Sequence, residues 1–75
     1  MQPTNEYAVV LEPTATGYSV YVPDLHGCVS AGGNRDEALE MIAEAIEMHV
    51  ESLREHGGDV PSPATLVDQV AVRAA

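Results

Sequence analysis

Between Asn34 and Gly57, the apolar and polar positions repeat with the period of an α-helix, and no proline or glycine interrupts them. Asn34 can cap the first turn, and Glu37 stands three positions later, where a capping box has its acid. Gly57 and Gly58 supply a C-terminal stop. At about 100° per residue, one face of this helix is apolar. Its residues are Leu39, Ile42, Ala43, Ile46, His49, Val50 and Leu53. We therefore predict one amphipathic helix over this stretch.

The opposite face of the predicted helix collects its glutamates within roughly a quarter-turn. Met41 and Met48 fall beside these acids. A run of charges is usually only solvated, but methionine adapts to irregular surfaces, so two of them at this edge favour contact with another chain. We favour contact with a second copy of the chain over contact with a basic partner protein. The predicted partner-binding residues are Glu40, Met41, Glu44, Glu47, Met48 and Glu51.

Three stretches before the helix have the pattern of strands, residues 7–12, 18–22 and 28–31. After the helix, prolines favour an extended connector, and residues 66–72 alternate as a last strand. The order is β-β-β-α-β, which predicts a two-layer α+β fold with one helix packed on a small mixed sheet. We expect a single domain over residues 1–75, with flexible ends at 1–6 and 73–75.

One helix covers only one face of such a sheet. Ala8, Val10 and Tyr21 would then be left on the second face, and a domain this small tolerates little apolar exposure. These three residues are the predicted oligomer contacts, in a homodimer or a tetramer. The sequence leaves open which of the two forms, and whether the last strand pairs within its own chain or is exchanged.

Composition narrows the function classes. Twelve acidic residues against three arginines give a formal net charge of −9, which repels phosphate backbones and disfavours direct nucleic-acid binding. An acidic protein is a natural partner for a basic one, although the acids can also serve solubility alone. The single cysteine excludes an internal disulfide, and no zinc spacing occurs, so we expect no cofactor. A free thiol, with neither a signal peptide nor a long apolar run, favours the cytoplasm and no membrane.

The loop before the third strand contains Pro23, Asp24, Gly27 and Cys28, and each has a structural explanation. Proline stops sheet pairing, Asp24 can cap local N–H groups, glycine permits a positive φ, and cysteine packs as a small hydrophobe. His26 and Cys28 lack further ligands for a metal and an orienting group for nucleophilic catalysis.

Catalysis by clustered carboxylates is also disfavoured. The candidates for a two-metal nuclease would be Glu12, Asp68 and a helix glutamate such as Glu40 or Glu44. The helix glutamates lie opposite the apolar face and point away from the sheet. We therefore predict that the protein is not an enzyme.

The motifs of this chain are Val22-Pro23-Asp24-Leu25-His26-Gly27-Cys28, then Gly33, then Glu37-Ala38-Leu39, with Tyr7 and Gly17-Tyr18 before them and prolines after the helix. Taken together, they resemble the HicB-like antitoxin family. The resemblance implies a partial ribonuclease-H-like fold, homo-oligomerisation and neutralisation of a small basic HicA-like toxin that cleaves messenger RNA. Longer members carry a C-terminal DNA-binding segment. This chain stops after residues 66–72, so we expect no direct DNA binding. The alternatives are a solitary oligomer with a structural or small-ligand role and, less favoured, a metal-dependent nuclease.

Overall fold

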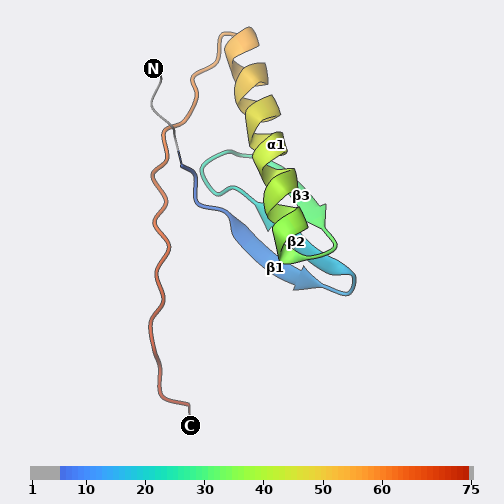
Figure 1. The fold of residues 1–75 in the computed structure, drawn as a ribbon. Helices are drawn as coiled ribbons and strands as arrows, with labels where there is room; N and C mark the ends of the chain where they lie inside the picture. Colours follow the sequence, from blue (N-terminus) through green and yellow to red (C-terminus); the bar gives the residue numbers. More distant parts are fainter. Residues whose placement is uncertain (1–5, 75) are drawn as a thin grey trace.

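The structure is a computed structural model that describes residues 6–74. Three strands, β1 (Val10–Thr14), β2 (Gly17–Tyr21) and β3 (Val29–Gly32), are followed by one helix, α1 (Arg35–Glu55). The strands pair in the order β1-β2-β3, antiparallel throughout, and α1 covers one face of the sheet (Figure 1). This arrangement confirms the two-layer α+β fold. The flexible ends expected at 1–6 and 73–75 include residues 1–5 and 75, which lie outside the described range.

The register of the sheet decides which side chains reach the core. Leu11 pairs with Val20, and Val20 pairs with Ser30, so this row faces α1. The first strand begins at Val10 rather than Tyr7, because β2 ends at Tyr21, the partner of Val10. The buried core is small and joins β2, the following loop and α1. It consists of Val20, Val22, Leu25, Cys28, Ala38 and Ile42.

Both ends of α1 have the predicted signals. Asn34 Oδ1 accepts a hydrogen bond from the Glu37 backbone N–H at 2.8 Å, and Glu37 Oε1 accepts one from the Gly33 N–H at 3.0 Å. In a standard capping box the Glu37 side chain would accept from the N–H of the cap residue, Asn34. Here it accepts from the N–H of the residue before the cap, Gly33. Gly57 ends the helix with φ at +73°, in the left-handed region.

The apolar face of α1 differs from the prediction at three alanines. Ala43 was expected on it but is exposed, whereas Ala38 is fully buried and Ala45 packs against the core. The cause is a close approach between α1 and β3. A Cβ on Gly32 would collide with the backbone N and Cα of Ala38, so only glycine fits there. At this contact the face of α1 that carries Ala38 lies against β3.

The last predicted strand also differs. Within the described residues, 66–72 pair with no strand, so the sheet has three strands and no parallel pair. The C-terminal segment, residues 61–74, is exposed along its whole length and runs away from the domain (Figure 1). Alternating apolar residues and prolines keep this segment extended, and no strand among residues 6–74 pairs with it. Among the described residues, no helix is long and apolar enough to cross a bilayer.

Candidate partner-binding surface

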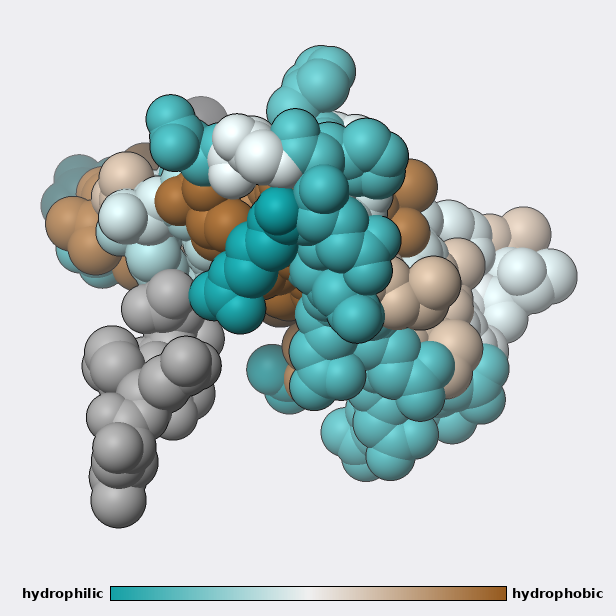
Figure 2. All heavy atoms as spheres, turned by 90° about the horizontal axis from the view of Figure 1, so that it is seen from above, coloured by the Kyte–Doolittle hydropathy of each residue, from teal (hydrophilic) through white to brown (hydrophobic). Residues whose placement is uncertain are grey.

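The acidic face of α1 consists of Glu40, Glu44, Glu47 and Glu51, and all four side chains are exposed. Figure 2 shows hydrophilic side chains gathered over the helix, with hydrophobic ones beside them. Successive members are three or four positions apart, which makes them neighbours on the helix surface. Each such pair of like charges destabilises a helix by about 0.2–0.5 kcal/mol. The face therefore holds an electrostatic repulsion that a cationic partner would relieve.

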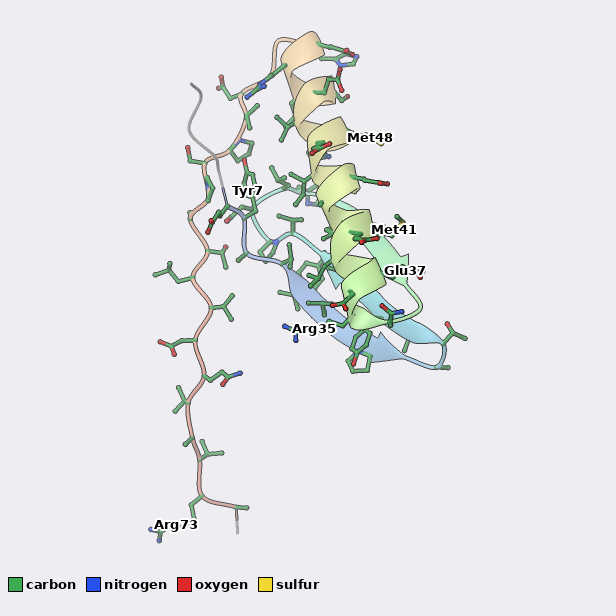
Figure 3. All side chains as sticks on the ribbon, viewed as in Figure 1. Tyr7, Arg35, Glu37, Met41, Met48 and Arg73 are labelled. Atoms are coloured by element: carbon green, nitrogen blue, oxygen red, sulfur yellow. The ribbon has the colours of Figure 1, made fainter. Side chains whose placement is uncertain are left out.

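The two methionines predicted at this surface differ in exposure. Met48 is 70% exposed, whereas Met41 is half-buried. Both lie on the side of α1 that faces away from the C-terminal segment (Figure 3). Met48 lines one wall of a shallow groove of about 300 Å³ between α1 and the start of β3. The groove is lined by Gly27, Cys28, Val29, Ala45, Met48 and His49.

Sequence reasoning missed Val29, which is 65% exposed on the β3 side of this groove. Its exposure depends on sheet register, which a single short strand does not reveal. Tyr21 pairs with Val10 on one side and with Val29 on the other, so these three side chains form a row on the face opposite α1. Tyr21 is 39% exposed, and Val10 and Ala8 are half-buried. Of the predicted oligomer contacts, Val10 and Tyr21 thus belong to an apolar row that also includes Val29, whereas Ala8 lies before the start of β1.

The loop between β2 and β3 positions a carboxylate that fixes the chain after α1. Asp24 Oδ2 accepts hydrogen bonds from the backbone N–H groups of Ala64 and Thr65, each at 2.9 Å, and Asp24 Oδ1 accepts one from Thr65 Oγ1 at 2.7 Å. The N–H groups that Asp24 caps are therefore 40 and 41 positions away in sequence, whereas we expected it to cap N–H groups of its own loop. These hydrogen bonds lower the pKa of Asp24 below its ordinary value. The bond from the Thr65 N–H has the largest effect, and the bond from the Ala64 N–H has the next largest.

The rest of the loop is structural. Gly27 has φ at +81°, Pro23 is exposed where the strand ends, and Cys28 is 4% exposed in the core. Burial raises the pKa of the Cys28 thiol, which keeps the sulfur protonated and unreactive. No group of three or more His, Cys, Asp or Glu side chains converges as a metal site within residues 6–74. Glu12 lies on β1 and Asp68 on the exposed C-terminal segment.

Comparison with known proteins places this arrangement in a family. The profile of the HicB-like antitoxin of bacterial toxin–antitoxin systems matches residues 7–74. The chain belongs to the HicB-like antitoxin family. Membership in this family favours a non-catalytic role for this HicB-like chain.

Similar proteins agree with the assignment. A UPF0150 protein of Synechocystis is 37% identical over 67 residues, which cover 88% of this chain and 85% of that one. Antitoxin HicB 2 of Photorhabdus laumondii is 31% identical over 65 residues, 87% of this chain and 47% of the relative. An uncharacterised 14.9 kDa protein of Haemophilus phage HP1 is 40% identical over 55 residues, 73% of this chain and 41% of the relative. The HicB-like chain thus spans half or less of the last two relatives.

A solved structure has the same fold. A chain of the HicA3 and HicB3 toxin–antitoxin complex superposes with a TM-score of 0.70 and 32% identity, over 79% of this chain and 69% of that one.

Proposed function

We propose that this chain is an antitoxin that binds and neutralises a small basic toxin similar to HicA, which cleaves messenger RNA. The observation that carries the proposal is the exposed acidic face of α1, set beside the exposed Met48. Family membership and the likeness to a chain of a HicA–HicB complex support it. The site of action is the cytoplasm, and direct DNA binding is not part of the function because the net charge is −9.

The mechanism is occlusion of the toxin's RNA-binding surface. The carboxylates of Glu40, Glu44, Glu47 and Glu51 take the positions of RNA phosphates against a cationic surface, which speeds encounter and selects a basic partner. Apolar contacts at Met48 and Met41 then slow dissociation, because desolvated apolar anchors contribute most of the binding energy at an interface. Binding also removes the repulsion among the four glutamates.

The test is co-purification with a HicA-like toxin encoded beside the gene for this chain. We expect a stable complex whose affinity falls as salt rises, since exposed charges are screened. The double variant Glu44→Gln with Glu47→Gln should weaken binding by at least about tenfold. The matched control, Glu6→Gln with Glu12→Gln, removes the same charge from exposed positions outside α1 and should bind as the wild type does. Failure of the wild-type chain to associate with the toxin contradicts the proposal.

A further inference from the structure

The groove between α1 and the start of β3 is hollow because the residues around it have little bulk. Ala45 lines it on the α1 side and Gly27 on the loop side, and a Cβ added to Gly27 would meet no heavy atom within 4 Å. Cys28 is 4% exposed, so it belongs to the floor of the groove. The volume of about 300 Å³ lies at the lower end of the range for ligand pockets. The groove therefore suits an apolar side chain better than a cofactor.

Met48 separates this groove from the acidic face of α1. Around the helix axis, Ala45 lies about 60° to one side of Met48, whereas Glu44 and Glu51 lie about 40° and 60° to the other side. Both glutamates are exposed, and both are surface neighbours of Met48, one four positions before it and one three positions after it. Arg54 lies about 60° beyond Glu51 and away from the groove. An apolar hollow and two carboxylates thus share one rim.

The spacing of these two carboxylates is that of a neighbouring helix. Glu44 and Glu51 are seven positions apart, which places them about 10.5 Å apart along α1 and only about 20° apart around it. A second helix packed alongside presents side chains at the same interval from its own positions seven apart, and a side chain three or four positions from each lies between them. Side chains on one face of a strand recur about every 6.8 Å, which does not match this interval.

Other occupants fit this rim less well. Nucleic acids and anionic lipid surfaces carry the charge that Glu44 and Glu51 repel. The C-terminal segment of the same chain runs on the other side of α1 from Met48 (Figure 3). A second copy would bring a net charge of −9 to a rim that is already acidic. Charge complementarity therefore favours a cationic partner with an apolar side chain among its cations.

We infer that the groove takes one apolar side chain from a basic amphipathic helix of the partner, with a lysine or arginine of that helix placed at each of Glu44 and Glu51. The apolar side chain enters between Met48 and Gly27, and methionine suits this contact because it is enriched at interfaces and adapts its shape. The two cations stand three or four positions before and after the apolar residue in the partner's sequence. The inference rests on the proposed function, since the partner is the proposed toxin.

The first test titrates the full-length chain, labelled with ¹⁵N, with a synthetic helical peptide of about 20 residues. The peptide carries one leucine, with a lysine three positions before it and another four positions after it. We expect the amide resonances of Gly27, Ala45 and Met48 to shift. Replacement of the leucine by serine, or of both lysines by glutamine, should weaken binding by at least about tenfold.

Three outcomes of this titration overturn the inference. If the peptide without lysines binds as well as the first one, the groove accepts any apolar group. If Gly27 and Ala45 do not shift with the peptide at millimolar concentration, no helix of this kind enters the groove. If the same amides shift when the free chain is concentrated, a second copy covers the groove.

A pair of variants carries the test to the toxin complex. Met48→Ser removes the apolar rim, and Val67→Ser removes an apolar side chain of nearly equal exposure from the C-terminal segment, 67% against 70%. Met48→Ser should raise the dissociation constant for the HicA-like toxin by at least about tenfold, and Val67→Ser by no more than about threefold. Both side chains are exposed, so the helix content by circular dichroism should match that of the wild type.

The two experiments separate this inference from the proposed function. Equal toxin binding by Met48→Ser and the wild type overturns the inference and leaves the proposed function standing. Entry of the peptide into the groove of a wild-type chain that does not bind the toxin would support the assignment of the groove and contradict the proposed function.

Discussion

The carboxylate of Asp24 and the backbone of Thr65 are joined by hydrogen bonds across 41 positions of sequence. Asp24 Oδ2 also accepts from the Ala64 N–H, so one side chain fixes the point where the C-terminal segment leaves the domain. We expect Asp24→Asn to loosen this point, because the amide that replaces one carboxylate oxygen cannot accept a hydrogen bond. Hydrogen exchange at the Ala64 and Thr65 amides should become several-fold faster.

The control for this change is Asp68→Asn, whose carboxylate in the wild type accepts a bond only from the next residue, Gln69. That variant should leave exchange at Ala64 and Thr65 unaltered. Unaltered exchange in Asp24→Asn would show that the hydrogen bonds to Asp24 do not hold the segment.

The same carboxylate predicts a pH dependence. Because its hydrogen bonds lower the pKa of Asp24 in the folded chain, the stabilisation is complete above the unfolded value of about 3.9. It is lost as pH falls through the lower, folded value. In an NMR titration, the Ala64 and Thr65 amide resonances should shift in this acidic range and stay constant from about pH 5 to 7. A midpoint above the ordinary value for aspartate would contradict the assignment.

The contact between Gly32 and Ala38 predicts a large loss of stability from one methyl group. In Gly32→Ala, the new Cβ would collide with the backbone of α1, which cannot move without displacing the helix. We expect the free energy of unfolding to fall by about 1–3 kcal/mol or more. Gly33→Ala is the matched control, since its Cβ would have only the Glu37 carboxylate oxygens nearby, at 3.8 and 4.0 Å. Urea denaturation of both variants measures the difference, and equal stabilities would refute the close approach.

Burial of Cys28 predicts slow modification of its thiol. The side chain is 4% exposed and burial raises its pKa, so iodoacetamide should react at least about 100-fold more slowly with the folded chain than with the chain in urea. The thiol added by Val29→Cys, at a position that is 65% exposed, should react rapidly in the folded chain. Equal rates at the two positions would mean that the core opens readily at Cys28.

Local signals in the sequence predict α1 well, because a helix period, an N-cap and a C-terminal glycine all act within a few residues. The burial of Ala38 and the exposure of Ala43 were not predictable, since they depend on the approach of Gly32. The alternation in residues 66–72 predicts a last strand, which the structure does not form, because alternation alone does not supply a neighbouring strand.

The candidate surface was predictable to a similar extent. Helical geometry alone places the four glutamates of the acidic face on the exposed side of α1, as the structure has them. Exposure of Val29 depends on the register of the sheet, which no local pattern encodes, and Met41 is half-buried although it was expected at the exposed edge of α1. Asp24 was recognised as a capping residue, but its partners lie 40 and 41 positions away.

Inhibition of RNA cleavage tests most directly whether the acidic face of α1 neutralises a basic RNA-cleaving toxin. Purified wild-type chain, titrated into the HicA-like toxin encoded beside its gene, should stop cleavage near a one-to-one ratio of chains. The double variant Glu44→Gln with Glu47→Gln should require at least about tenfold more protein, whereas Glu6→Gln with Glu12→Gln should act as the wild type does. Continued cleavage in the presence of excess wild-type chain would contradict the account.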